Sequence, residues 1–257
     1  MDRVHVATLN IRNLADRWGE RLLLLLADMA ALQPDVLGLQ EVVFPAHQDR
    51  VIGAAGERRY RALRGWAGRP DYGNSLLFAD TLGAGNVERL DLGLNRCAIR
   101  TVVALPGDGT LIVAVTHLHH EVDGGREREE QTSRLLEWLD SAGSAATGQV
   151  VMGDFNADPD EPATRRMAAA GFRSAYAVAN GLEPAVTWPS GIQAPGMDTD
   201  GDPACLDYIW VGSAIRVTSA RLAFDRPHPD DPTLYPSDHF GLSAHLEIGA
   251  SADRPAH

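Results

Sequence analysis

Short apolar runs with the period of a β-strand recur along this chain and limit what it can fold into. In the first run, Val4–Asn10, apolar and polar residues alternate, with Val4 and Val6 on one face. Further runs lie at 36–40, 60–63, 75–79, 97–104, 111–116, 149–152, 206–211 and 242–248. Helical spacing separates some of them, at 17–32, 126–139 and 162–170. Strands with interspersed helices predict a mixed α/β fold.

The domain organisation follows from what lies between these runs. The 257 residues contain no Ser/Gly tract, low-complexity stretch or internal repeat that would mark a linker. We therefore expect one domain over residues 1–248, followed by a disordered tail at 249–257. Two long segments, 188–204 and 225–236, are rich in Pro, Gly and Asp. Loops of this length inside a compact domain are usually functional or mobile.

Charge and composition exclude several classes of chemistry. The net charge is −12, from 35 acidic and 23 basic residues, and every basic residue is Arg. The absence of Lys excludes a lysine Schiff base and a P-loop lysine. The acidic balance disfavours nucleic-acid binding that depends on charge alone. A nuclease remains open, because a metal ion can supply positive charge locally.

Cellular context is indicated by the cysteines and by the apolar stretches. Cys97 and Cys205 have no CxxC or Cys/His zinc spacing, so we expect two buried, reduced thiols. The N-terminus carries no long apolar run, and Leu22–Leu26 is far shorter than the ~20 residues that a membrane span needs. We expect a monomeric cytoplasmic protein that does not associate with membranes.

Polar side chains collect where the predicted strands end or begin. They are Asn10, Glu41, His117, Asp154, Asn156, Asp207, Asp238 and His239. Taken singly, such a carboxylate is most often a turn or cap residue, and such a histidine a structural hydrogen bonder. Taken together, they favour a site, because sites form where strands stop and loops begin.

The residue types at these strand ends favour hydrolysis of a phosphate ester. Carboxylate and amide oxygens without Cys suit a hard cation such as Mg²⁺ or Mn²⁺. The metal would offset the charge that develops on the phosphoryl oxygens and the leaving group. A carboxylate or a histidine can take the proton of an attacking water. An Asp207–His239 pair would fix the imidazole tautomer and favour its charged form.

The order of the short motifs resembles one family. They are TLN (8–10), LQEV (39–42), THL (116–118), GDFN (153–156), LDYI (206–209) and SDH (237–239). Each alone is weak, but six in this order are specific, and they resemble the endonuclease/exonuclease/phosphatase family. The resemblance implies an α/β fold built as a four-layer α/β/β/α sandwich, with two packed mixed β-sheets flanked by helices.

The resemblance also implies a set of metal ligands. Glu41 would be the principal ligand of the metal, with Asn10 and Asp238 close by in the metal shell. Arg96, in the stretch NRCAIR, matches a position where members of the family often place a basic residue near the phosphate.

Catalytic roles are implied for the remaining strand-end residues. Asp154 would orient or deprotonate the attacking water, and Asn156 would hold that water and a phosphoryl oxygen. His117 and His239 would bind and polarise the scissile phosphate, with Asp207 behind His239. Whether Asp154 or His239 is the general base stays open at this point.

The chain departs from the family pattern in two places. Abasic-site endonucleases often have an Arg two residues before the Asp of LDYI, where this chain has Cys205, so duplex DNA is a less favoured substrate. Three histidines also occur within four residues, at 117, 119 and 120. If the strand continues past His117, His119 falls on the same side and contacts substrate or a second metal. Otherwise His119 and His120 are exposed loop residues.

Two further sequence features, a basic and aromatic stretch and two long loops, bear on the class of substrate. The one stretch with the basic and aromatic pattern of a nucleic-acid reader is ERRYRALRGWAGRP (57–70), which also fits a strand with solvated arginines. We therefore favour a small phosphorylated molecule, in a pocket walled by the loops that contain Trp188, Met197, His228 and Tyr235. A nuclease is the alternative, and a non-catalytic binding protein of the same fold is less favoured because every expected catalytic position is filled.

Overall fold

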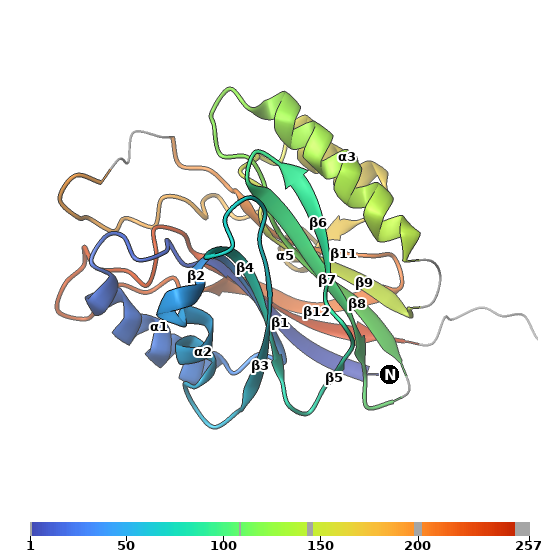
Figure 1. Ribbon diagram of the computed structural model, residues 1–257, viewed down its shortest axis with the longest axis horizontal. Coiled ribbons are helices and arrows are strands. Elements are labelled where there is room, and N and C mark those ends of the chain that lie inside the picture. Colours follow the sequence, from blue (N-terminus) through green and yellow to red (C-terminus); the bar gives the residue numbers. More distant parts are fainter. Residues whose placement is uncertain (1, 108, 143–145, 198–201, 250–257) are drawn as a thin grey trace, which may run out of the picture.

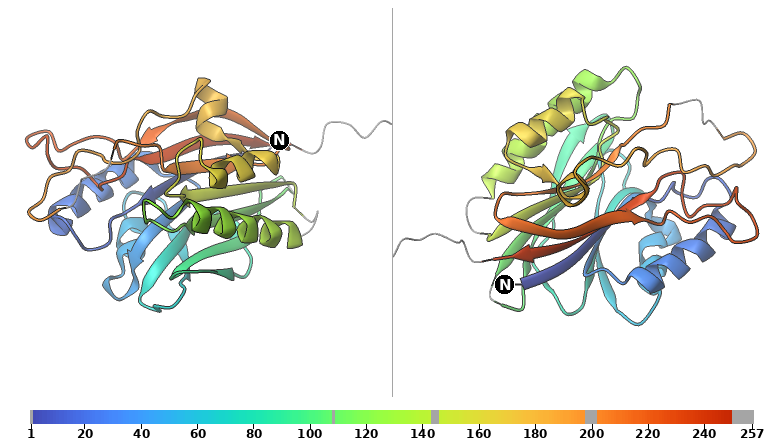
Figure 2. Two further views of the ribbon diagram at one scale, coloured as in Figure 1. Left: turned by 90° about the horizontal axis from the view of Figure 1, so that it is seen from above. Right: turned by 180° about the vertical axis from the view of Figure 1, so that it is seen from behind.

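Two β-sheets lie face to face, with helices on the outer face of each (Figures 1 and 2). The structure is a computed structural model that describes residues 2–107, 109–142, 146–197 and 202–249. Figure 2 shows α1 and α2 outside one sheet and α3 and α4 outside the other. This arrangement confirms the α/β class and the two packed, helix-flanked sheets that the family resemblance implied.

The first sheet has six strands in the order β12-β13-β1-β2-β4-β3. Its strands are β1 (Asp2–Asn10), β2 (Val36–Val43), β3 (Tyr60–Gly65), β4 (Tyr72–Ala79), β12 (Ile215–Ala223) and β13 (Gly241–Ile248). β1 and β2 are parallel, and β13 pairs antiparallel with β1. The carboxyl ends of β1 and β2 therefore lie at the same edge as the residues that lead into β13.

The second sheet has seven strands, with β10-β11-β9-β8-β7-β5 in order and β6 paired to β7. Its strands are β5 (Gly83–Ala84), β6 (Glu88–Gly93), β7 (Arg96–Ala104), β8 (Thr110–His117), β9 (Gly148–Asp154), β10 (Arg173–Ser174) and β11 (Asp207–Val211). β8 and β9 are parallel, whereas β11 runs antiparallel to β9. Both sheets are therefore mixed.

Four of the described helices cover the two outer faces: α1 (Trp18–Leu32), α2 (Gln48–Gly53), α3 (Gly125–Ser141) and α4 (Pro162–Ala169). The helix α5 (Ala175–Asn180) instead contacts β11 and β12 and adds Ala175 to the core between the sheets, and a short 3₁₀ turn spans Phe44–Ala46. The leucine run indeed lies on α1, which buries Leu25 and Met29 against the first sheet. α3 buries Leu135 and Leu139 against the second. Each helix thus contributes one apolar stripe to a core.

The main core lies between the sheets. Val4 and Val6 point into it from β1, as their spacing predicted, and meet side chains of the second sheet such as Val115 and Met152. The sheets approach closely at Gly38 of β2, where an added Cβ would lie 2.8 Å from the Met152 sulfur. A side chain at Gly38 would therefore push the sheets apart.

Sequence periodicity missed β6, β12 and the short helices α2 and α5. β12 is a polar edge strand with Arg216, Thr218 and Arg221, and a register shift between Val217 and Ser219 interrupts its alternation. α2 and α5 each have six residues, which is too short for a helical period to emerge.

The predictions for the cysteines, for membrane spans and for the C-terminal tail can be compared with the structure. Cys97 and Cys205 are free and buried, as expected. Within the described part of the chain, no helix has the length and apolar character needed to cross a membrane. Most of the expected disordered tail, residues 250–257, lies outside the described residues.

Two histidines form a pair on the first sheet. His5 and His245 are opposite each other on β1 and β13, and their rings stack with centroids 4.1 Å apart. His5 Nε2 lies 2.7 Å from the Ser243 hydroxyl. Burial, followed by the neighbouring His245, lowers the pKa of His5 to about 4. The native state therefore holds His5 neutral.

We predict a loss of stability in mild acid that comes from His5. The unfolded chain takes up a proton at His5 near its ordinary pKa of 6.5, whereas the native protein does so only near 4. The free energy of unfolding therefore falls as pH decreases from 6.5 towards 4. His5→Phe keeps a ring against His245 but cannot take up a proton. The free energy of unfolding of this variant, measured with urea, should therefore fall less steeply between pH 6.5 and 4 than that of the wild type. The control His47→Asn changes an exposed histidine and should follow the wild type. If the free energy of unfolding fell equally steeply with pH in His5→Phe and in the wild type, His5 would not be the source of the loss.

Candidate active site

The predicted strand-end residues meet at one end of the sandwich. In the first sheet Asn10 ends β1, next to Gln40 of β2. In the second, His117 ends β8 and lies opposite Asp154, which ends β9. Because β11 runs antiparallel, its first residue, Asp207, is also opposite Asp154. Residues far apart in the sequence are thus neighbours at this edge.

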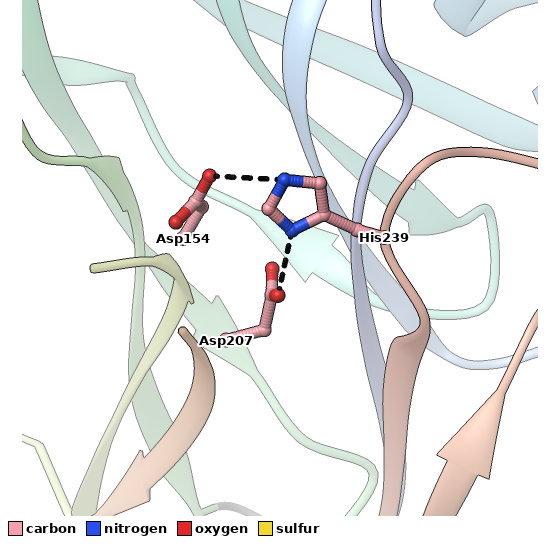
Figure 3. A group of neighbouring side chains, drawn as sticks. All are labelled: Asp154, Asp207 and His239. Atoms are coloured by element: carbon pink, nitrogen blue, oxygen red, sulfur yellow. Dashed lines mark hydrogen bonds and ion pairs between the residues drawn. The ribbon is translucent and has the colours of Figure 1, made fainter. Parts of the chain in front are cut away.

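Asp154, Asp207 and His239 form a buried cluster (Figure 3). His239 lies between the two carboxylates, with Nδ1 2.8 Å from Asp207 Oδ2 and Nε2 3.8 Å from Asp154 Oδ2. All three side chains are buried, and Asp207 Oδ1 has no hydrogen-bond partner among the described residues. Asp207 therefore directs its other oxygen to His239, which fixes the orientation of the ring.

Burial and charge act in opposite directions on this cluster. Burial lowers the pKa of His239, but Asp207 and Asp154 outweigh it and raise the pKa overall. Burial raises the pKa of Asp154, and Asp207 adds to that rise while His239 and Asn10 oppose it. His239 is therefore held as an imidazolium, with one N–H donating to Asp207 and the other facing Asp154.

His117 is the second imidazole beside Asp154. Its Nε2 lies 3.4 Å from Asp154 Oδ2, and Arg96 Nη1 lies 2.9 Å from the same nitrogen. Burial, followed by the charge of Arg96, lowers the pKa of His117 well below its usual value. A neutral His117 has one ring N–H that can donate to an anionic oxygen, and the guanidinium of Arg96 adds positive charge beside it.

Two amides hold the Asp154 carboxylate. Asn10 donates from Nδ2 to Asp154 Oδ2 at 2.9 Å, and the Asn156 backbone N–H donates to Oδ1 at 2.9 Å. The side chain of Asn156 donates to the Leu118 carbonyl at 3.1 Å. Asn156 has a φ of 47°, which Asn tolerates better than most residues. The position of Asp154 is therefore set by both sheets.

Glu41 and Asp238 lie beside this cluster. Glu41 is half-buried and accepts from Asn13 Nδ2 at 2.8 Å and from Asn10 Nδ2 at 3.4 Å. Asp238 is buried, with its Oδ2 3.4 Å from Arg12 Nη1. Sequence reasoning missed Arg12 and Asn13, although both lie within three residues of the end of the TLN motif. Their only signal was that position.

The donor set fits a hard divalent cation. Glu41 is the half-buried carboxylate of the group, and the buried carboxylates of Asp154, Asp207 and Asp238 add further oxygen atoms without a thiol. The buried trio of Asp154, Asp207 and His239 could also offer ligand atoms within 4.8 Å of one another. The hydrogen bond between His239 and Asp207 occupies the ring nitrogen Nδ1, so a metal held by this trio would have to use Nε2 of His239.

The histidine pair after β8 does not continue the strand. β8 ends at His117, so the alternation that would place His119 beside it does not extend that far. The His119 N–H instead donates to Gln131 Oε1 at 2.8 Å, and its ring meets His120 edge to face. Burial, then His120 and Arg96, lowers the pKa of His119. His119 is half-buried, and the positive charge of Arg96 acts on its ring, whereas His120 is exposed.

The loop containing Trp188 supports the site through its backbone. Thr187 accepts at Oγ1 from the N–H groups of Leu206 and Asp207, and Ser190 N–H donates to the Asp238 carbonyl. Trp188 itself pairs with Ala204. The expected pocket walls, Trp188, Met197, His228 and Tyr235, line neither of two cavities found in the described part of the chain. One of these, a small recess, is instead lined by Tyr72, Asn95, Arg96 and His117.

Comparison with known proteins agrees with this geometry. The model of the Endonuclease/Exonuclease/phosphatase family matches residues 7–239. Nocturnin from Xenopus laevis is 31% identical over 256 residues, covering 88% of this chain and 64% of that protein. Human Nocturnin is 29% identical over 266 residues, covering 92% of this chain and 60% of that protein. The chain therefore spans less than two thirds of the length of these relatives.

Solved structures share the fold. The human Nocturnin catalytic domain with bound sulfate anion superposes with a TM-score of 0.76 and 26% identity, over 97% of each chain. A mannosyl-6-phosphatase of Bacteroides thetaiotaomicron gives a TM-score of 0.77 at 18% identity, over 95% of this chain and 99% of that one. The second likeness concerns the fold alone.

We predict that Asp207 sets the protonation of His239. Asp207→Asn removes the negative charge that raises the pKa of His239 most. The effect of burial, which lowers this pKa, is then opposed by less negative charge, so the pKa of His239 should fall. NMR titration of the imidazole signals in the metal-free protein measures it. The His5 ring serves as an internal control, because it lies on the opposite end of β1 and should titrate as in the wild type. An unchanged His239 titration would show that Asp207 does not hold the proton.

Proposed function

The chain belongs to the endonuclease/exonuclease/phosphatase family, and we propose that it hydrolyses a phosphoester bond of a small phosphorylated substrate with Mg²⁺ or Mn²⁺ as cofactor. The observation that carries this proposal is the surroundings of Asp154. One carboxylate is met there by His117, His239, Asn10 and the Asn156 backbone. Such a group can hold a water next to donors that face phosphate oxygens.

Most of these side chains have contacts that support the role proposed here. Asp154 orients the attacking water or takes its proton. Asn156 would hold that water and a phosphoryl oxygen, for which its Nδ2 would turn away from the Leu118 carbonyl. His117 and His239 bind and polarise the scissile phosphate, and Arg96 adds positive charge next to His117. Asp207 keeps the His239 ring in place through its Nδ1 bond. Donors placed in advance around a developing anion lower the barrier, because they need no reorganisation during the reaction.

The metal would be held by Glu41, with Asn10 and Asp238 nearby. When bound, it supplies positive charge that offsets charge developing on the phosphoryl oxygens and the leaving group. Asn10 donates to both Glu41 and Asp154, so it couples the metal-binding carboxylate to the water-binding one.

Electrostatics support a small substrate over a nucleic acid. The chain carries a net charge of −12 and no Lys, so a long polyanion gains little from it outside the site. A nuclease is the second candidate, because Arg58, Arg59, Arg61, Arg64 and Arg69 gather on or near β3. A panel of bis-p-nitrophenyl phosphate, mononucleotides, dinucleotides, oligonucleotides and plasmid, each with Mg²⁺ or Mn²⁺, separates the two. Preference for the small compounds is expected, and preference for the polymers would overturn the substrate class.

We predict that Glu41→Gln removes metal-dependent hydrolysis. The amide keeps the shape and can still accept from Asn13, so the protein should fold with wild-type circular dichroism. Activity at limiting Mg²⁺ should fall roughly 100-fold or more, because the metal contributes several kcal/mol to the transition state. Glu57→Gln, at an exposed position, is the matched control. Wild-type turnover by Glu41→Gln at limiting Mg²⁺ would show that Glu41 does not hold the metal.

Substitutions of His117, which ends β8, and of His119 and His120, which follow it, should lower hydrolysis by different amounts. His117→Ala removes a buried donor next to Asp154 and should abolish hydrolysis, whereas His119→Ala should be intermediate and change substrate preference. His120→Ala should be close to silent, because its ring is exposed. Steady-state kinetics on two phosphoesters of different size would establish the order. If His120→Ala were the most damaged of the three, the placement of these side chains would be wrong.

A further inference from the structure

A groove of about 770 Å³ lies along β3, at the opposite end of the strands from the candidate active site. β3 is the last strand of the first sheet, as Figure 1 shows, and it pairs only with β4 among the described strands. The groove is bounded by Gly53 and Ala54 of α2, by residues 60–63 of β3, and by Ala84. None of these residues belongs to the candidate active site.

The backbone of β3 offers hydrogen-bonding groups to this groove. Asp80 N–H donates to the Arg59 carbonyl, so Arg59 and Asp80 are a hydrogen-bonded pair of the β3–β4 ladder. By alternation, the N–H and C=O groups of Tyr60 and Ala62 point away from β4, towards the groove. The next outward carbonyl, that of Arg64, is taken by Arg89 Nε at 3.0 Å. No side chain in the described part of the chain donates a hydrogen bond to the carbonyls of Tyr60 and Ala62.

Arginines flank this open stretch on both sides. Arg50 reaches it from α2, and Arg59 and Arg61 share one face of β3. Arg61 is engaged by Asp80 and the Leu82 carbonyl. The guanidinium groups of Arg50 and Arg59 have no partner among the residues described. Glu57 also borders the groove and has no ion-pair partner among the described residues, so these three side chains leave one net positive charge, opposite in sign to the net charge of −12 of the chain.

The charges select among possible occupants. A second copy of β3 would bring Arg59 and Arg61 against their own kind, and like charges in facing strands destabilise the pairing. A nucleic acid is disfavoured because the outward carbonyls would repel phosphates. Tyr60 also offers no free stacking face, since it packs on the core under α1 and α2 and its hydroxyl donates to Pro34.

We propose that the open edge of β3 binds an extended acidic segment of a partner protein, which adds to the first sheet as a further strand. Its backbone would pair with Tyr60 and Ala62, and carboxylates at alternate positions would meet Arg59 and Arg61 on one face of the extended sheet. Residues 60–64 accommodate roughly 17 Å of strand, about five residues.

The test uses a fluorescein-labelled peptide of about seven residues that alternates Glu and Thr. Fluorescence anisotropy should show binding to the full chain and no binding of the matching Lys–Thr peptide. Ala62→Pro removes only the outward N–H, which takes no part in the β3–β4 ladder, and should weaken binding at least about tenfold. Ala62→Ser keeps the N–H and should bind as the wild type does. Arg59→Glu should also weaken binding at least about tenfold.

Controls separate the edge from general effects. Arg165→Glu makes the same charge change at an exposed position on α4 and should leave peptide binding unchanged. Thermal unfolding and hydrolytic activity verify that each variant is folded. Hydrogen exchange should show new protection of the Tyr60 and Ala62 amides when the peptide binds. The proposal is overturned if the Lys peptide or an oligothymidylate of equal charge binds this edge more tightly, if the Glu peptide does not bind, or if a folded Ala62→Pro protein binds it as well as the wild type.

Discussion

The guanidinium of Arg21 lies fully buried on α1, and its donors reach only main-chain carbonyl oxygens. The acceptors are Ile11, Arg12, Asn13, Ala15, Asp16 and Pro236, at 2.6–3.4 Å. Burial lowers the pKa of Arg21 to about 10, and the carbonyl dipoles make its buried charge tolerable. Two loops are tied by this one side chain: the loop that follows β1 and the loop that leads into β13.

The first of these loops could not hold its shape unaided. Arg12, Asn13, Asp16 and Arg17 all have positive φ, a conformation that costs roughly 1 kcal/mol or more for each residue with a Cβ. Its shape places Asn13 against Glu41 and Arg12 against Asp238. The bond from Arg21 to Pro236 sets the start of the second loop, which carries Asp238 and His239. The geometry around Glu41 and Asp238 thus depends on a residue that contacts neither of these side chains.

The strand runs and their polar ends were readable from the sequence because period-2 alternation and apolar runs reflect burial directly. The roles of Arg12 and Arg21 were not readable. Arg21 precedes the leucines of α1 and looks like a surface residue, since arginine is rarely buried. Its acceptors are backbone atoms, which leave no trace in side-chain pattern. The end of β8 at His117 could not be read from the sequence for a related reason. The backbone N–H of His119 donates to the side chain of Gln131, which lies on α3 and is far from His119 in any strand pattern.

The packing of the two sheets assembles the site as well as the core. Asn10 of the first sheet bonds to Asp154 of the second, and His239, which leads into β13, bonds to Asp207 of β11. Each half of the site therefore completes the other, and neither sheet alone carries the arrangement. The charges are also nearly matched, with Glu41, Asp154, Asp207 and Asp238 against Arg12, Arg96 and a protonated His239. These formal charges sum to −1, so a phosphate bound alone would add to an existing excess of negative charge. A divalent cation bound with the phosphate would offset that charge, so the electrostatics of this site favour the anion when the cation is present.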